Sequence, residues 1–136
     1  MIPKCRAWDI HGQKMFYNDE LIIWNNNVYA NDSKKLSCDY LKGWSIDEEY
    51  LMHSTGLCDK EGTEVFEGDI LHHQIQTDYT FIVKYDKDKG RWYGDGLSRT
   101  YRIDITKEFL QYYKVIGNIY ANQELLENKG KLNDNN

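Results

Sequence analysis

Acidic residues crowd the middle of the chain and are the first candidates for chemistry. Five carboxylates fall close together: Asp59, Glu61, Glu64, Glu67 and Asp69. An EF-hand calcium loop needs oxygen ligands at alternate positions, with Gly sixth and Glu twelfth. Here Lys60 stands second after Asp59 and Gly62 stands fourth, so the spacing fails, and DKDKG at Asp86–Gly90 fails because Lys interrupts the acids. We expect no metal and no cofactor, and interpret both stretches as turns.

Nucleophilic catalysis would need a cysteine beside a histidine. The candidate pairs are Cys58 with His53, and Cys38 with His72 or His73. Adjacent residues of a strand point to opposite faces, so His72 and His73 cannot both serve one site in one subunit. Asp59 follows Cys58, and a neighbouring carboxylate disfavours the reactive thiolate. Three widely spaced cysteines give neither a disulfide framework nor a zinc pattern. We therefore expect no enzyme, and an uncertain hydrolase-type activity of unknown reaction stays open as an alternative.

The segment Lys84–Arg102 combines positive charge with aromatic rings. Its candidate binding residues, for nucleic acid or for a subunit contact, are Lys84, Lys87, Lys89, Arg91, Trp92, Tyr93, Arg99, Tyr101 and Arg102. Single-stranded nucleic acids bind to aromatic stacking faces flanked by cations. The whole chain, however, carries a net charge of −5, whereas nucleic-acid binders usually have a basic footprint. Nucleic acid is therefore the alternative interpretation and not the first.

Self-association is the first interpretation of the uneven charge. Acids dominate Ile46–Ile70, and the basic segment follows. Surfaces of opposite charge could meet across a subunit boundary. The acidic interface candidates are Asp59, Glu61, Glu64 and Glu67. Eleven Tyr and four Trp also favour contacts, since interfaces are enriched in aromatic residues. The other interpretation is that both segments are solvated faces of a monomer.

Short strands must position these residues. The composition predicts strands at 2–9, 14–17, 21–24, 28–30, 63–66, 79–85 and 114–120, with a further strand from residue 70 and a return strand at 91–93. Residues 46–53 favour a strand, 31–44 a short helix or irregular lobe, and 101–113 is ambiguous with a helical face. The corner residues are Gly56, Gly62, Gly68, Asp69 and Gly117. Glycine permits positive φ or close backbone approach there, and Asp69 should accept backbone N–H groups.

The predicted fold class is mainly β with minor α (α+β). We expect N-terminal hairpins and a small lobe in residues 1–52, an SH3-like β-barrel with a short C-terminal helix in 53–128, and a disordered tail in 129–136. The chain has no apolar run that could cross a bilayer, and MIPKCRAWD lacks the apolar core of a signal peptide. The expected location is the cytoplasm of the host cell, without membrane partners.

Three segments resemble the signatures of the YopX family of phage and prophage proteins. They are IPKCRAWD near the start, LMHSTGLCDKEGTEVFEGDIL in the middle and VIGNIYANQELLE near the end. Small departures occur, such as Cys5 in place of an aromatic residue and Gln123 in place of Pro. The resemblance implies a phage accessory protein of unestablished biochemical role, a homo-oligomer, and no catalytic residues.

Together these features predict a non-enzymatic, oligomeric binding module that holds a host or phage protein, or a small ligand at subunit interfaces. The first alternative is a single-stranded nucleic-acid-binding protein that uses the hairpin 84–102. The second is an enzyme of unknown reaction.

Overall fold

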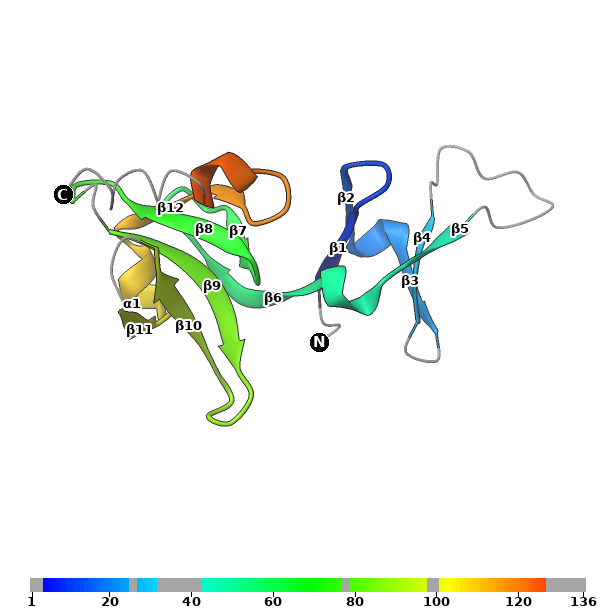
Figure 1. The fold of residues 1–136 in the computed structure, drawn as a ribbon. Coiled ribbons are helices and arrows are strands. Elements are labelled where there is room, and N and C mark those ends of the chain that lie inside the picture. The colour runs from blue at the N-terminus through cyan, green and yellow to red at the C-terminus, as the bar shows by residue number, and fades with distance from the viewer. Residues whose placement is uncertain (1–3, 25–26, 32–42, 77–78, 98–100, 127–136) are drawn as a thin grey trace. The chain divides into compact units, whose positions relative to one another are not determined.

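The computed structural model describes residues 4–24, 27–31, 43–76, 79–97 and 101–126 of the chain. The part that it describes is built mainly from short strands (Figure 1). The strands are β1 (Cys5–Asp9), β2 (Lys14–Tyr17), β3 (Leu21–Trp24), β4 (Asn27–Asn31), β5 (Gly43–Ile46), β6 (Leu51–Cys58), β7 (Glu64–Phe66), β8 (Asp69–His73), β9 (Thr80–Asp86), β10 (Arg91–Gly96), β11 (Arg102–Asp104) and β12 (Tyr113–Asn118). The helical elements include η1 (Asn18–Glu20), η3 (Glu48–Tyr50) and α1 (Lys107–Leu110).

The chain divides into two compact units, Met1–His53 and Ser54–Asn136. The predicted boundary followed residue 52. The division lies inside β6, whose beginning pairs with β1 and whose later part pairs with β7. The fold class predicted from the sequence, mainly β with minor α, is confirmed.

The first unit contains the two predicted hairpins. β1 pairs with β2, with Ala7 opposite Phe16, and β3 pairs with β4. Ala7, Phe16, Val28 and Ile46 form its buried core. The predicted helix or lobe at 31–44 falls mostly outside the described residues. For its last two residues the prediction is wrong. Gly43 and Trp44 belong to β5 because this segment pairs with β4.

The stretch between β5 and β6 is also less extended than predicted. Residues 46–53 favoured a strand, and the structure places the short 3-10 turn η3 there before β6 begins at Leu51. Asp47 explains the turn, because its carboxylate accepts the backbone N–H of Glu49 at 3.2 Å. A side-chain oxygen at this position satisfies a donor that the turn leaves open.

The second unit contains, among its described residues, an antiparallel five-stranded sheet in the order β11-β10-β9-β8-β12. β9 and β10 form the predicted hairpin, with Trp92 opposite Tyr85. Figure 1 shows this sheet curling, with α1 near the strands β10 and β11. The ambiguous segment 101–113 resolves into β11, then α1, then the start of β12. Thr106 caps the beginning of α1, because its hydroxyl oxygen accepts the N–H of Phe109 at 3.1 Å.

The sheet encloses one side of a hydrophobic core. Its largest fully buried members include Leu71, Phe81, Val83 and Leu110. Residues 123–126 form a last helical turn, in the region where a short C-terminal helix was predicted. The sheet is a curled half-barrel with β11 and β12 at its two ends, and the SH3-like barrel itself stays a prediction. No helix of the described chain is long and apolar enough to cross a membrane.

Candidate functional site

The second unit holds a groove of about 1120 Å³ whose lining is dominated by aromatic rings. The aromatic lining residues are Tyr79, Phe81, Tyr101, Phe109, Tyr112 and Tyr113. Three of them lie in β9, in α1 and at the start of β12. The other three directly precede β9, β11 and β12. Ligand sites are typically apolar concavities with a few polar groups, so this groove is the strongest candidate site among the described residues.

Buried rings form the floor of the groove. Phe81 is 2% exposed and Tyr113 is 6% exposed. The ring of Phe109 stacks on Tyr113 with centroids 4.1 Å apart and an interplanar angle of 17°. Phe81 contacts both of these rings edge-on, at 5.8 Å each. Edge-to-face and stacked pairs fix the rings relative to one another, so the floor is preformed.

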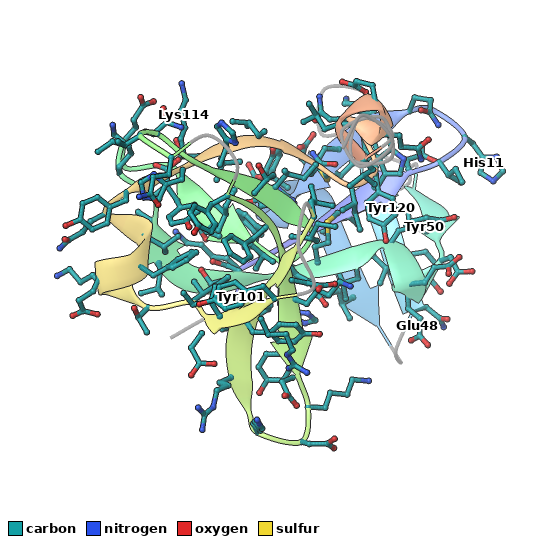
Figure 2. All side chains as sticks on the ribbon, turned by 60° about the vertical axis from the view of Figure 1, so that its left-hand side comes forward. His11, Glu48, Tyr50, Tyr101, Lys114 and Tyr120 are labelled. Carbon is teal, nitrogen blue, oxygen red and sulfur yellow. The ribbon has the colours of Figure 1, made fainter. Side chains whose placement is uncertain are left out.

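Exposed tyrosines stand at the walls. Tyr101, labelled in Figure 2, is 49% exposed, and Tyr112 is 54% exposed. The imidazole of His73 stacks on Tyr112 with centroids 6.0 Å apart. The Nδ1 atom of His73 accepts the backbone N–H groups of Ile75 at 3.1 Å and Gln76 at 2.9 Å. We infer that the proton of the neutral ring is on Nε2, and these bonds hold the ring in place.

The floor of the groove remains uncharged over the physiological pH range. Burial raises the pKa of the Tyr113 phenol to about 12, and the nearby phenols of Tyr79 and Tyr101 add to the rise. The hydroxyl therefore keeps its proton at neutral pH. The groove can supply ring faces and neutral hydroxyls to a ligand, with charged groups confined to its rim.

The predicted basic segment is a hairpin whose cations are largely paired. The ion pairs are Lys84 with Asp95 at 2.7 Å, Arg91 with Asp104 at 3.0 Å, and Arg102 with Asp86 at 2.9 Å. The carboxylate of Asp86 also accepts the backbone N–H groups of Lys89 and Asp88. These two hydrogen bonds, together with the ion pair to Arg102, hold the pKa of Asp86 below its ordinary range. These pairs neutralise much of the positive charge that a phosphate backbone would require.

The aromatic residues of the basic segment do not form one face. The guanidinium of Arg102 lies 3.8 Å from the ring centroid of Tyr93, and Trp92 packs edge-on against Tyr85 at 4.9 Å. Tyr101 instead lines the aromatic groove. Lys87 and Lys89 are exposed at the hairpin turn, and Arg99 lies outside the described residues.

Asp59, predicted as an acidic interface residue, is buried and is 7% exposed. Its carboxylate accepts three backbone N–H groups, those of Glu61, Thr63 and Val115, each at 2.9 Å. The expectation that Asp59 faces another subunit is therefore corrected. The carboxylate therefore joins the turn at 59–63 to β12.

The other predicted acids are more accessible. Glu61 is exposed and lies 3.6 Å from the Nζ atom of Lys114, labelled in Figure 2. Glu64 and Glu67 are half-buried. Solvent-exposed pairs such as Glu61 with Lys114 contribute little free energy, so these side chains remain accessible to a partner.

The predicted corner residues have structural roles. Asp69 is 1% exposed, and its carboxylate accepts the N–H of Phe66 at 2.7 Å. Gly56, Gly62 and Gly68 have φ of 78°, 85° and 86°, which glycine adopts without a steric penalty. At Gly117 a Cβ would lie 2.6 Å from the side chain of Asn122, so close approach explains this glycine.

The described cysteine and histidine candidates for nucleophilic catalysis lie on β6 and β8. His53 and Cys58 are both exposed on β6, and Cys38 lies outside the described residues. His72 shares a hydrogen bond with the hydroxyl of Thr80 at 2.9 Å. Burial raises the pKa of the Cys5 thiol. Within the described ranges, no group of three His, Cys, Asp or Glu side chains could hold a metal ion.

Comparisons with known proteins agree with one another. The YopX protein family model matches residues 4–127. The crystal structure of protein EF1440 from Enterococcus faecalis is similar, with 28% identity, a TM-score of 0.61, and coverage of 93% of this chain and 99% of that one. Protein yopX from Bacillus subtilis has 22% identity, a TM-score of 0.60 and coverage of 93% and 97%. No curated protein matches. The chain belongs to the YopX family.

Proposed function

We propose that this chain is a non-enzymatic binding module, which oligomerises and holds another molecule in the aromatic groove of its second unit. The observation that carries the proposal is the pair of half-exposed tyrosines, Tyr101 and Tyr112, above buried rings. Concave aromatic surfaces that stay exposed in a folded domain are the usual sites of ligand or protein contact.

The groove favours binding over chemistry. Its residues supply ring faces, the neutral phenol of Tyr113 and the fixed imidazole of His73. A catalytic site would need a nucleophile beside a base within hydrogen-bond reach. The described cysteines Cys5 and Cys58 and the candidate base His53 are not among the residues that line the groove. We propose a binding role on this ground.

The biological setting follows from the family resemblance. A phage or prophage accessory protein in the host cytoplasm would act by holding a host or phage protein. Oligomerisation is supported by exposed charges of opposite sign, such as Glu61 in the turn at 59–63 and Lys87 and Lys89 in the turn at 86–90. Light scattering at low and at high salt tests it, and a monomer under both conditions would contradict it.

The test of groove binding is a capture experiment from host cells that carry the phage. The bait proteins are the wild type, the double variant Tyr101→Ala with Tyr112→Ala, and the control Tyr17→Ala. Tyr17 is 48% exposed and belongs to the first unit, so it matches Tyr101 in exposure. We expect proteins that the wild type and the control retain and the double variant loses. Equal capture by all three would contradict the proposal.

Single-stranded nucleic acid is the second candidate. Tyr85, which is 42% exposed, stands beside Trp92 and near the exposed turn lysines, and such rings can stack on bases. The ion pairs of Lys84, Arg91 and Arg102 weaken this candidate. The test is fluorescence anisotropy with a labelled oligonucleotide. Binding at low salt that Trp92→Ala with Arg91→Ala abolishes would support it, and no binding would exclude it.

A further inference from the structure

The outer edge of β11 borders the aromatic groove. β10 pairs with β11 so that Gly94 lies opposite Ile103. The N–H of Gly96 donates to the carbonyl of Tyr101, and the N–H of Ile105 donates to the carbonyl of Trp92. In an antiparallel ladder the bonded residues alternate with residues whose N–H and C=O groups point the other way. Tyr101, Ile103 and Ile105 therefore bond to β10.

The residues between them face outward. By this alternation the backbone N–H and C=O groups of Arg102 and Asp104 point away from β10, and both residues line the groove. β11 is an end strand of the described sheet. An end strand with outward donors and acceptors is a template on which an extended peptide can add. The groove thus offers a strand edge beside aromatic rings.

The charges at the rim favour a cation. The guanidinium of Arg102 is engaged by the ring of Tyr93 and the carboxylate of Asp86. Glu108 lies on α1, lines the groove, and makes no ion pair with any residue in the described ranges. Tyrosine ring faces attract ammonium and guanidinium groups. A phosphate backbone would instead meet the carboxylate of Glu108, while the guanidinium of Arg102, which also lines the groove, is already engaged.

Building on the proposed function, we infer that the groove receives an extended peptide segment of a partner protein. The segment adds as a strand to the outer edge of β11. One of its arginine or lysine side chains lies over Tyr101 or Tyr112 and pairs with Glu108. The partner is thus a protein with an exposed, basic, extended segment, which fits a chain whose net charge is −5.

The first step of the test is a selection with displayed random peptides. Peptides are selected on the wild-type protein and counter-selected on the double variant Tyr101→Ala with Tyr112→Ala. We expect recovered peptides to share an arginine or lysine next to residues that favour extended structure. Recovered peptides without a basic residue, or no peptide that depends on the tyrosines, would overturn the inference.

The second step separates the strand edge from the side chain at position 102. A fluorescein-labelled synthetic copy of a recovered peptide is titrated against Arg102→Ala and Arg102→Pro, both checked for folding by circular dichroism. Both variants lose the guanidinium, but only proline loses the outward N–H, and an edge strand tolerates proline. We expect about tenfold weaker binding for Arg102→Pro than for Arg102→Ala. Equal affinity would overturn strand addition.

The third step tests the cation. Glu108→Gln should weaken the arginine peptide about fivefold and leave a citrulline version unchanged. Glu124→Gln is the control, because Glu124 is an exposed acid that does not line the groove. Equal effects on both peptides would overturn the charge pairing. The inference fails alone if no basic peptide is selected while cellular capture still depends on Tyr101 and Tyr112. The proposed function fails with it if that capture is independent of the two tyrosines.

Discussion

Replacing Asp59 by alanine should destabilise the second unit more than any exposed acid does. The carboxylate accepts three backbone N–H groups at 2.9 Å, and the residue is 7% exposed. A hydrogen bond to a charged group contributes about 1.5–3 kcal/mol, and an orphaned buried donor costs about 1–3 kcal/mol. The three bonds share one carboxylate and are not additive. We expect a loss of about 3–5 kcal/mol in the free energy of unfolding for Asp59→Ala.

The conservative variant and the control sharpen this expectation. Asp59→Asn keeps one acceptor oxygen for the turn but presents an NH₂ group to the N–H of Val115, so about 1–2 kcal/mol should be lost. Glu61→Ala removes a carboxylate whose side chain is 52% exposed and lies 3.6 Å from Lys114. We expect a change below about 0.5 kcal/mol for that control.

Urea unfolding followed by circular dichroism measures these free energies, and amide hydrogen exchange measures the bond to Val115 directly. In Asp59→Ala the amide of Val115 should lose protection by about tenfold or more relative to its neighbours in β12. The reasoning is refuted if Asp59→Ala unfolds within about 0.5 kcal/mol of Glu61→Ala, or if the Val115 amide stays as protected as in the wild type.

Three further expectations concern Tyr113 in the groove, Gly94 in β10 and the corner residue Asp69. Since the pKa of Tyr113 rises from about 10 to about 12, stability should fall by about 2 kcal/mol as pH rises through that window, and Tyr113→Phe should remove this fall in pH-dependent urea unfolding. Gly94→Ala should cost about 1–3 kcal/mol in urea unfolding, because its Cβ would lie 3.0 Å from the Cβ of Phe81. Asp69→Ala should lower the free energy of unfolding by about 2–4 kcal/mol, since Phe66 loses its acceptor.

Local sequence patterns were enough to predict most strands. The run at 79–85 and the turn at 86–90 predict the β9–β10 hairpin because their signals lie within a few residues of one another. The same kind of signal placed the hairpins of the first unit. It failed at Gly43 and Trp44, where pairing with β4 overrides a helical spacing.

The direction of a turn carboxylate could not be predicted in the same way. Asp59 and Glu61 stand two residues apart in one acidic turn. Asp59 is buried because β12, more than fifty residues later, brings the Val115 N–H to it. The same packing leaves the side chain of Glu61 exposed to solvent. Charge counts along the sequence treat the two residues alike.

The groove was missed for a related reason. The aromatic excess predicted contacts, but among the candidate binding residues only Tyr101 and Arg102 line the groove. Its other rings come from segments between residues 79 and 113 that the folded sheet brings together. In contrast, an ion pair of the basic hairpin could have been predicted from the sequence. The strand register that follows from the turn at 86–90 places Lys84 near Asp95.

The most direct test of the groove as a binding site is the affinity of a captured partner for three proteins, measured by isothermal titration calorimetry. The proteins are the wild type, the double variant Tyr101→Ala with Tyr112→Ala, and the exposure-matched control Tyr17→Ala. We expect the double variant to bind at least about tenfold more weakly and the control to bind like the wild type. Equal affinity of the double variant and the wild type would contradict the account.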